Sequence, residues 1–322
     1  MTNVKNKPEI VFMGTPGFAA GILSMLAGQG YFIKGVVTVP DKPAGRGMTA
    51  RSSAVKTTAV ELGIPVLQPE SLKDTVFLET LRQWNAPVFV VVAFRMLPRC
   101  VWEIPSCGCF NLHTSLLPQY RGAAPINHVL INGEQETGLT TFLIDDHMDT
   151  GAILLQEPVT IDPEDDAGSL HDKLMTAGGP LIATTIDGLW TGSLKATPQQ
   201  LVSKNDLKTA PKITRDTCRI DWSLDPVRIT NLVRGLSPVP AAYATLKNGD
   251  VVQDVKIFRA GAEWLPHREK PGSIVTDGKK TLKVACNKGF VHILELQTPG
   301  KKHLKTPAFL AGFRNSDNAI FQ

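Results

Sequence analysis

Val88-Phe89-Val90-Val91-Val92-Ala93 is an uninterrupted apolar run of strand length. A strand that is apolar at every position is typical of a central parallel strand, which is buried on both faces of its sheet. The segment that follows, 94–98, is therefore expected at the crevice where α/β sheets bind ligands. The next predicted strand is 108–113, and we expect its carboxyl end to face the same cavity.

Predicted strands and helices alternate around these two strands over the first 190 residues. Further strands are expected at 9–13, 36–39, 65–67 and 138–144. Helices are expected from residue 18 onward and at 53–62, 74–84, 125–132 and 169–190. This alternation predicts a Rossmann-like α/β domain with a parallel sheet over residues 1–190.

The first glycine turn does not have the spacing of a dinucleotide-binding loop. Gly14-Thr-Pro-Gly17 follows the first strand but lacks the G-x-G-x-x-G pattern. Asp41 lies two residues beyond the second strand, inside a Pro/Gly-rich loop, and does not resemble a ribose-binding strand end. We therefore expect no NAD, and a nicotinamide dehydrogenase is the least favoured function.

Composition describes a globular chain with reduced thiols. The 322 residues are 43% hydrophobic and 20% charged, which favours two domains. No apolar run approaches membrane-spanning length, and the polar first ten residues give no sign of a signal peptide. The five cysteines are scattered, and no second pair accompanies Cys107 and Cys109, so we expect neither disulfides nor a metal site. Reduced thiols of this kind predict a cytoplasmic protein.

Charge is distributed unevenly along the chain. Residues 1–202 hold 14 basic and 19 acidic side chains, whereas residues 203–322 hold 20 and 11. The basic second part is expected to meet a polyanion, although solvated lysines would give the same skew.

The composition and the predicted secondary structure change after residue 190. Residues 191–208 are predicted to be a linker, and 209–322 a second domain. A helix near 225–235 is followed by short predicted strands at 241–247, 251–259, 272–276, 281–285 and 290–296. This spacing predicts a small OB-like β-barrel, a fold often used on nucleic acids.

Candidate catalytic residues lie at the end of the 108–113 strand. Asn111 and His113 are two residues apart, so both side chains leave the same face. An amide donor beside an imidazole suits chemistry at a carbonyl, because one holds the oxygen while the other moves a proton. Two buried, satisfied polar groups would explain this pair alone equally well, but the unusual turn that follows favours a site. Asp149 is expected to lie against His113, where neighbouring strands stop.

A basic loop spans residues 40–53 and is rich in proline and glycine. It carries Lys42, Arg46 and Arg51. This loop is interpreted either as a connector or as a flap that contacts phosphate.

Several joined motifs resemble the folate-dependent formyltransferases, and more narrowly those members that act on methionyl-tRNA. The resemblance covers nearly the whole chain. Its motifs are Gly14-Thr-Pro, Pro40-Asp-Lys-Pro-Ala-Gly-Arg-Gly47, Asn111-x-His113, Ser115-Leu-Leu-Pro-x-Tyr-Arg-Gly-Ala-Ala-Pro125, Met148-Asp-Thr-Gly151, the 211–222 junction and Pro299-Gly-Lys-Lys302.

The resemblance implies that 10-formyltetrahydrofolate donates a formyl group to the α-amine of methionyl initiator tRNA, for translation initiation. His113 would take the amine proton, Asn111 would bind the formyl oxygen, and Asp149 would orient His113. No metal is implied.

The resemblance also implies contacts for both substrates. The residues implied for folate are Ala93, Phe94, Arg95, Met96, Leu97, Ser115, Leu116, Leu117, Pro118, Ile144 and Asp145. Arg95 departs from the family pattern, which has a small residue there, and is expected to reach the folate carboxylates or solvent. The residues implied for tRNA are Lys42, Arg46, Arg51, Lys212, Arg215, Lys301 and Lys302.

Two other functions share part of this pattern. A formyltransferase for a small amine, such as a sugar nucleotide or glycinamide ribonucleotide, would keep the same three residues but leave the basic second domain unexplained. An inactive RNA-binding relative would not need Asn111, His113 and Asp149.

Overall fold

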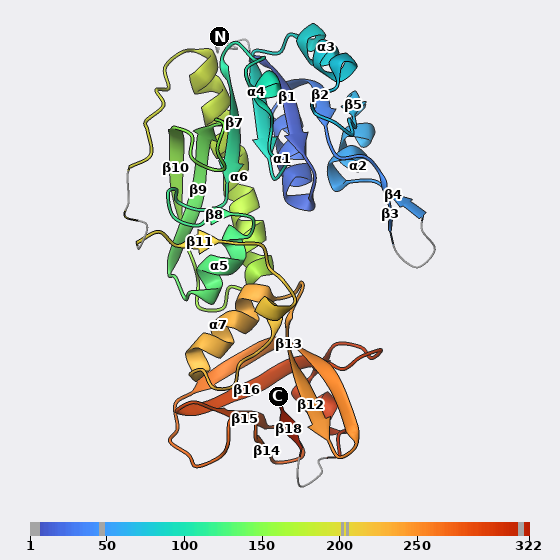
Figure 1. The fold of residues 1–322 in the computed structure, drawn as a ribbon, viewed down its shortest axis with the longest axis vertical. Coiled ribbons are helices and arrows are strands. Elements are labelled where there is room, and N and C mark those ends of the chain that lie inside the picture. Colours follow the sequence, from blue (N-terminus) through green and yellow to red (C-terminus); the bar gives the residue numbers. More distant parts are fainter. Residues whose placement is uncertain (1–6, 45–48, 201–202, 204–205, 315–318) are drawn as a thin grey trace. The chain divides into compact units, whose positions relative to one another are not determined.

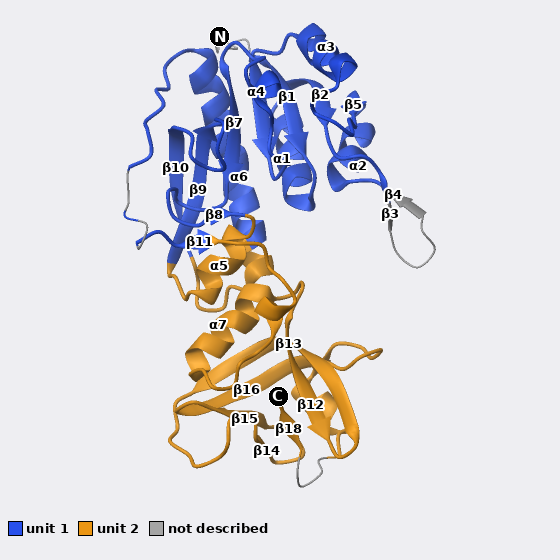
Figure 2. Ribbon diagram, viewed as in Figure 1, with its two compact units in different colours: residues 1–122, 136–160, 171–209 blue, residues 123–135, 161–170, 210–322 orange. Residues whose placement is uncertain are grey.

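The computed structural model describes residues 7–44, 49–200, 203, 206–314 and 319–322. The chain forms two compact units (Figure 2). Unit 1 comprises residues 1–122, 136–160 and 171–209, and unit 2 comprises 123–135, 161–170 and 210–322. The main part of unit 2 thus begins beside the expected domain start, but two earlier segments also belong to it.

A mixed seven-stranded sheet forms the centre of unit 1 (Figure 1). Its order is β10-β9-β7-β6-β1-β2-β5. The bounds are β1 Glu9–Gly14, β2 Phe32–Val37, β5 Val66–Leu67, β6 Val88–Val92, β7 Gly108–His113, β9 Glu136–Leu143 and β10 Ile153–Thr160. The chain reverses its direction of travel across the sheet between β1 and β6, where such sheets bind ligands.

The five strands from β5 to β7 are parallel, as the apolar run of β6 predicts. All five residues of β6 are buried. The prediction of a purely parallel sheet is incomplete, however, because β9 and β10 extend it in antiparallel fashion. β10 was not predicted, since its polar residues and Pro158 suit only an edge strand.

Helices cover both faces of this sheet. The bounds are α1 Gly17–Gly28, α2 Ala54–Glu61, α3 Thr75–Trp84, α4 Arg99–Trp102 and α6 Ala167–Trp190. Gly178 of α6 lies against Leu112 and Ile22, so α6 and α1 share one face. The other face packs on α3 and α4 through Phe77, Leu81 and Val101.

Two predicted helix starts carry side-chain caps. The Ser53 hydroxyl accepts from the Lys56 amide at 3.0 Å, and the Asp74 carboxylate accepts from the Phe77 amide at 2.9 Å. Such caps satisfy backbone donors that the helix itself leaves free. Short two-stranded elements complete the first unit, namely β3 Lys42–Ala44 with β4 Thr49–Arg51, and β8 Arg121–Gly122.

Unit 2 is an antiparallel barrel with helices packed on it. The strands are β12 Ala242–Asn248, β13 Val251–Glu263, β14 Ile274–Thr276, β15 Leu282–Cys286, β16 Gly289–Gln297, β17 Leu304–Lys305 and β18 Ile320–Phe321. The short strand β11 Thr209–Ala210 is not part of this barrel sheet. The helices are α5 Pro125–Ile131, η1 Asp216–Cys218, α7 Pro226–Leu236 and α8 Thr306–Leu310. The predicted OB-like barrel is confirmed.

The barrel is closed by hydrogen bonds between its two edge segments, at β18 and just before β14. The Phe321 amide donates to the Gly272 carbonyl at 2.9 Å, which joins the β18 side to the chain before β14. Trp222, Ile229, Leu246, Val284 and Phe321 are among the buried residues of its core. No helix in the described parts of either unit is both long enough and apolar enough to span a membrane.

Candidate active site

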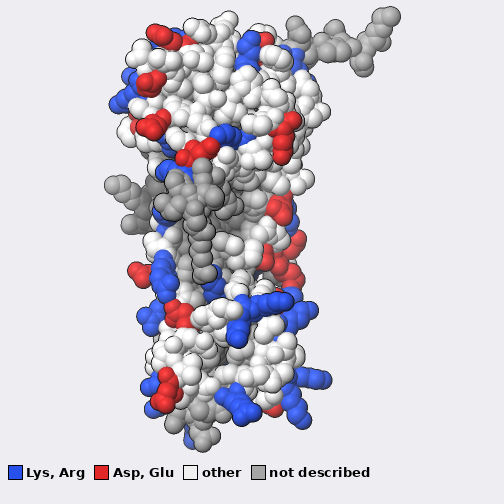
Figure 3. Space-filling view, turned by 90° about the vertical axis from the view of Figure 1, so that its right-hand side faces the viewer, with Lys and Arg blue, Asp and Glu red and all other residues white. Residues whose placement is uncertain are grey.

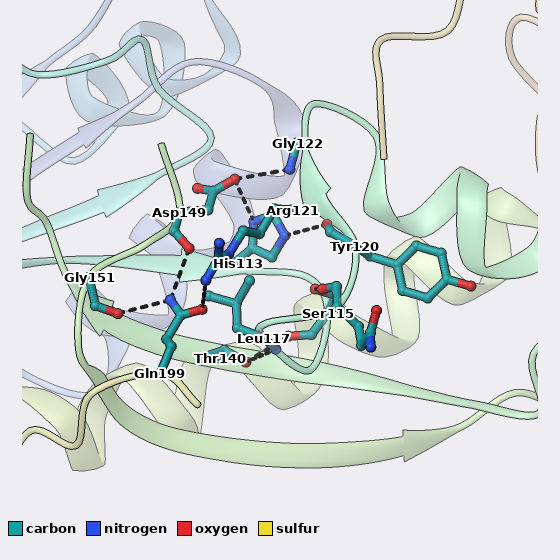
Figure 4. Close-up of polar contacts among 11 residues, drawn as sticks. His113, Ser115, Leu117, Tyr120, Arg121, Gly122, Thr140, Asp149, Gly151 and Gln199 are labelled. Carbon is teal, nitrogen blue, oxygen red and sulfur yellow. Dashed lines mark hydrogen bonds and ion pairs between the residues drawn. The ribbon is translucent and has the colours of Figure 1, made fainter. Parts of the chain in front are cut away.

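His113 is the last residue of β7, and its imidazole is almost completely buried, with 6% exposure. Its Nε2 lies 2.9 Å from the carbonyl oxygen of Tyr120 (Figure 4). Because a carbonyl oxygen can only accept, Nε2 carries a proton and donates it. Nδ1 is therefore the nitrogen that can take up a proton when the ring is neutral.

The turn after β7 fixes the position of that carbonyl. The Ser115 hydroxyl donates to the Gln119 carbonyl at 2.7 Å, and Tyr120 adopts a positive φ of 59°. Thr140 of β9 holds the turn, donating to the Ser115 carbonyl and accepting from the Leu117 amide at 2.7 and 3.1 Å. A left-handed tyrosine persists only where its surroundings impose it. The turn thus sets the tautomer of His113.

Asp149 reaches His113 by an unexpected route. β9 is antiparallel to β7, so its carboxyl end lies beside Phe110 and not beside His113. Asp149 nevertheless lies against His113, as expected, because the loop after Leu143 runs back toward the end of β7. A Cβ at Gly151 would lie 1.6 Å from the Leu143 carbonyl oxygen, so this return requires glycine.

The Asp149 carboxylate faces Nδ1 of His113. Its Oδ2 lies 3.9 Å from Nδ1 and accepts a hydrogen bond of 3.0 Å from the Gly122 amide. The carboxylate is largely buried, with 12% exposure. At 3.9 Å there is no direct hydrogen bond, but the charge is close enough to stabilise an imidazolium in this buried setting.

Asn111 is half-buried and lies two residues before His113 on β7. The strand alternates its faces, so the Asn111 side chain leaves the sheet on the same side as His113. That is also the side on which Cys109 packs beside α3 and α4. The structure thus brings amide, imidazole and carboxylate to one face of the sheet.

Gln199 was missed by sequence analysis, since it lies in the predicted linker. Its side-chain amide donates to the carbonyl oxygens of Asp149 and Gly151, at 2.9 Å each, and its Oε1 accepts from Arg121 (Figure 4). Thr197 also pairs with Ile153 of β10. The segment therefore holds the Asp149 loop, in which Asp149 itself has a positive φ of 55°. The Gly/Ser/Pro-rich composition gave no signal of this role.

The loop after β6 holds five of the residues predicted for folate. Ala93 is exposed with a φ of 47°, Phe94 is half-buried, Met96 is exposed and Leu97 is buried. A hollow of about 510 Å³ adjoins this loop, lined by residues 70–73, 95–99 and Asp146.

Arg95 is held by backbone groups of a neighbouring loop, and its contact with the folate carboxylates stays a prediction. Its guanidinium donates to the backbone carbonyls of Pro69 and Glu70, at 2.9 Å for Glu70. Its Nε is buried and has no hydrogen-bond partner among the described residues. Burial lowers the pKa of Arg95 from its ordinary value. The arginine thus ties two loops together.

The remaining predicted folate residues divide into two groups. Ser115 and Leu117 are buried, and Leu116 packs on Gly138, so this part of the turn supports His113. The contacts of this turn with folate, which the resemblance implies, stay a prediction. Pro118 is half-buried and follows a cis peptide bond.

Ile144 and Asp145 begin the Asp149 loop. The Ile144 amide donates to the Cys109 carbonyl at 2.9 Å. The Asp145 carboxylate accepts from the Thr150 hydroxyl and the His147 amide, at 2.9 and 3.0 Å. Asp145 thus closes the loop that carries Asp149.

The predicted tRNA-binding cations are exposed where their side chains are described. Lys42 opens β3 and pairs in register with Arg51 of β4, whereas Arg46 lies outside the described residues. Lys212, Arg215, Lys301 and Lys302 are exposed on unit 2. Figure 3 shows basic side chains outnumbering acidic ones over the visible surface of that unit.

No cluster of three or more His, Cys, Asp or Glu side chains suited to a metal occurs among the described residues. All five cysteines are free thiols. Burial raises the pKa of the Cys109 thiol, which makes it an inert core residue.

Family models match both units. The model described as formyl transferase matches residues 9–186, and the one described as the formyl transferase C-terminal domain matches residues 212–314. A methionyl-tRNA formyltransferase of Bacteroides fragilis is 51% identical over 314 residues, which are 96% of each chain.

Solved structures share the fold at low identity. HypX from Aquifex aeolicus, in complex with tetrahydrofolic acid, has a TM-score of 0.63 at 17% identity, over 97% of this chain and 49% of that one. WlaRD, a sugar 3N-formyl transferase in the presence of dTDP and 5-N-formyl-THF, has a TM-score of 0.63 at 19% identity, over 92% and 100%.

Proposed function

The chain belongs to the formyl transferase family, and from this premise we propose that it formylates the α-amine of methionyl initiator tRNA, with 10-formyltetrahydrofolate as donor. The single observation that carries the chemistry is the buried His113, whose Nδ1 faces the Asp149 carboxylate at 3.9 Å. The reaction belongs to translation initiation and therefore to the cytoplasm.

His113 acts as the base in this proposal. A free α-amine titrates near ~8, so much of it is protonated and not nucleophilic at neutral pH. As the amine attacks the formyl carbon it must lose a proton, and Nδ1 of His113 accepts it while Nε2 stays bonded to the Tyr120 carbonyl. The imidazolium that forms is then stabilised by Asp149.

Asn111 supplies the second contribution. Its side-chain amide donates to the formyl oxygen as negative charge develops there, and such a donor is typically worth about 3 kcal/mol. Asp149 stays fixed meanwhile, because the Gly122 amide binds its carboxylate and Gln199 binds its backbone.

When bound, the folate would supply the formyl carbon. As the bond from that carbon to the methionine nitrogen forms, its bond to N10 of the folate breaks, and N10 leaves with a proton returned by the His113 imidazolium. The exposed backbone at Ala93 and the apolar Phe94, Met96 and Ile144 would hold the pterin, beside the hollow of residues 70–73 and 95–99. These apolar side chains suit a flat heteroaromatic ring.

The positive charge of the second part of the chain favours initiator tRNA over a small amine as the acceptor. Residues 203–322 carry nine more basic than acidic side chains, from 20 and 11. A small amine would gain nothing from that surplus, whereas a polyanion gains counterion release at each neutralised phosphate.

The direct test is incubation of the protein with labelled 10-formyltetrahydrofolate and methionyl initiator tRNA. We expect the label on the α-amine of the methionine. Label transferred instead to a sugar nucleotide or glycinamide ribonucleotide, at a comparable or higher kcat/KM, would refute the proposed acceptor.

Arg46→Ala should damage tRNA use far more than folate binding. Loss of one phosphate contact removes about 0.7–0.9 from the log–log salt slope, and the KM for tRNA should rise several-fold. The measurement is KM for each substrate across a salt series. Arg82→Ala removes the same charge from an exposed position of α3 and should change neither. Equal loss for both substrates with Arg46→Ala would contradict this division.

Gln199→Glu should lower kcat about ten-fold, because a carboxylate cannot donate to the two carbonyls that Gln199 holds, and small misplacements of a catalytic loop are costly. The substrate KM values should change little, since Gln199 positions Asp149 and does not contact substrate. Steady-state kinetics and thermal unfolding of the variant give the measurement. A fall in Tm with unchanged kcat would assign Gln199 a purely structural role.

A further inference from the structure

A second hollow lies wholly within unit 2. Its volume is about 630 Å³, within the range of small-molecule sites. It is lined by four segments distant in sequence, namely 213–218, 240–243, 254–256 and 297–300. Of the predicted cations, Arg215 lines this cavity, and Lys301 directly follows the lining residue Gly300.

An arginine held over an aromatic ring forms one wall. The guanidinium carbon of Arg215 lies 4.9 Å from the ring centroid of Tyr243. Its Nη2 is paired with the Asp254 carboxylate, which also accepts from the Thr245 hydroxyl at 2.8 Å. The Arg215 side chain is nevertheless 75% exposed. An exposed guanidinium that is fixed from two sides is a preorganised stacking surface.

The surroundings combine apolar surface with positive charge. Ile213, Pro240 and Pro299 line the hollow beside Lys256, whose Nζ donates to the Pro240 carbonyl at 3.0 Å. Gln297 donates to the Lys301 carbonyl at 2.8 Å and so fixes the turn that carries the next two lysines. Among the described residues that line the cavity, Asp254 has the only carboxylate, and Arg215 is paired with it.

We propose that this hollow takes one unstacked nucleotide of RNA, with the base against the Arg215–Tyr243 pair and its phosphate near Lys256 and Lys301. Unpaired bases of RNA commonly stack on aromatic rings and on guanidinium planes. The inference rests on the proposed function in that initiator tRNA supplies the nucleotide. It assigns a base contact to Arg215, which the resemblance implies only as a tRNA-binding residue.

The test is equilibrium binding of uncharged initiator tRNA to the full chain, by fluorescence anisotropy over a salt series. Arg215→Lys keeps the charge but removes the plane, so affinity at fixed salt should fall about ten-fold with an unchanged salt slope. Lys301→Gln should instead reduce that slope by about 0.7–0.9.

Arg259→Lys is the matched control. Arg259 is also exposed on unit 2 and paired with a carboxylate, since its Nη2 lies 2.7 Å from Oε2 of Glu164. Its replacement should leave affinity and slope unchanged. Tyr243→Leu should match the loss caused by Arg215→Lys, whereas Tyr243→Phe keeps the ring and should bind as the wild type does.

Wild-type affinity in Arg215→Lys, or a reduced salt slope in that variant, would overturn the inference. The binding assay needs no formyl transfer, so the two proposals fail separately. If the wild type formylates methionyl-tRNA and the Arg215→Lys variant binds tRNA with wild-type affinity, only the base contact is refuted. Arg215-dependent binding without formyl transfer would refute only the proposed reaction.

Discussion

Replacing His113 with alanine should lower kcat for formyl transfer by about 10³-fold while tRNA and folate still bind. General-base catalysis typically contributes 10² to about 10⁴ in rate. His113 is the buried imidazole whose free nitrogen faces Asp149, and the Tyr120 carbonyl fixes its tautomer. Single-turnover formylation with saturating substrates measures the effect on the chemical step.

His113→Gln provides the control for the buried site. Its side-chain amide can still donate toward the Tyr120 carbonyl, but it cannot accept the proton from the amine. It should therefore be as inactive as His113→Ala, with thermal unfolding closer to that of the wild type. Turnover within a few-fold of the wild type in both variants would remove His113 from the mechanism.

Replacing Asp149 with asparagine should lower kcat by about 10²-fold or more. Oδ2 serves both the Gly122 amide and the imidazole side of His113. In the variant an amide oxygen at that position keeps the Gly122 bond but carries no charge to stabilise the imidazolium, and an amide nitrogen would oppose the Gly122 donor. Either orientation loses transition-state stabilisation.

Asp145→Asn is the control that tests whether the loss of kcat in Asp149→Asn comes from the lost charge beside His113 or from a disturbed loop. Asp145 lies in the same loop and accepts from Thr150 and His147, but no described contact links its carboxylate to His113. Asparagine can still accept both hydrogen bonds through its amide oxygen, so the Asp145 variant should retain most of kcat, and any loss should fall on the KM for folate, to which the resemblance assigns Asp145. Equal losses at both positions would mean that Asp149 acts only by holding the loop together.

Prediction from sequence succeeded where a local pattern has one dominant cause. The apolar run of β6 could only be buried on both faces, and the observed β7 has the predicted bounds of 108–113. The helices predicted at 53–62 and 74–84 are also present, and in the structure Ser53 and Asp74 cap them. Such signals are local, because neighbours within four residues decide them.

Prediction failed where the deciding partner is distant. The direction of β9 depends on its pairing with β7, and nothing within 136–143 reveals that direction. Gln199 is a polar residue whose side chain donates to backbone carbonyls, and any residue type offers a carbonyl. The roles of such residues follow from the fold and not from their own neighbours in sequence.

The two early segments that belong to unit 2 bear on how the chain can be divided. The Asn127 side chain on α5 donates to the Gly235 carbonyl on α7 at 2.7 Å, and Ile131 packs on the core of that unit. A fragment expressed from residue 209 onward would lack α5, so the surface of α7 that packs on α5 would be exposed. Exposed apolar surface of this kind promotes aggregation. Cleavage near residue 203 would likewise yield two pieces that stay associated, because the first piece retains part of the second unit.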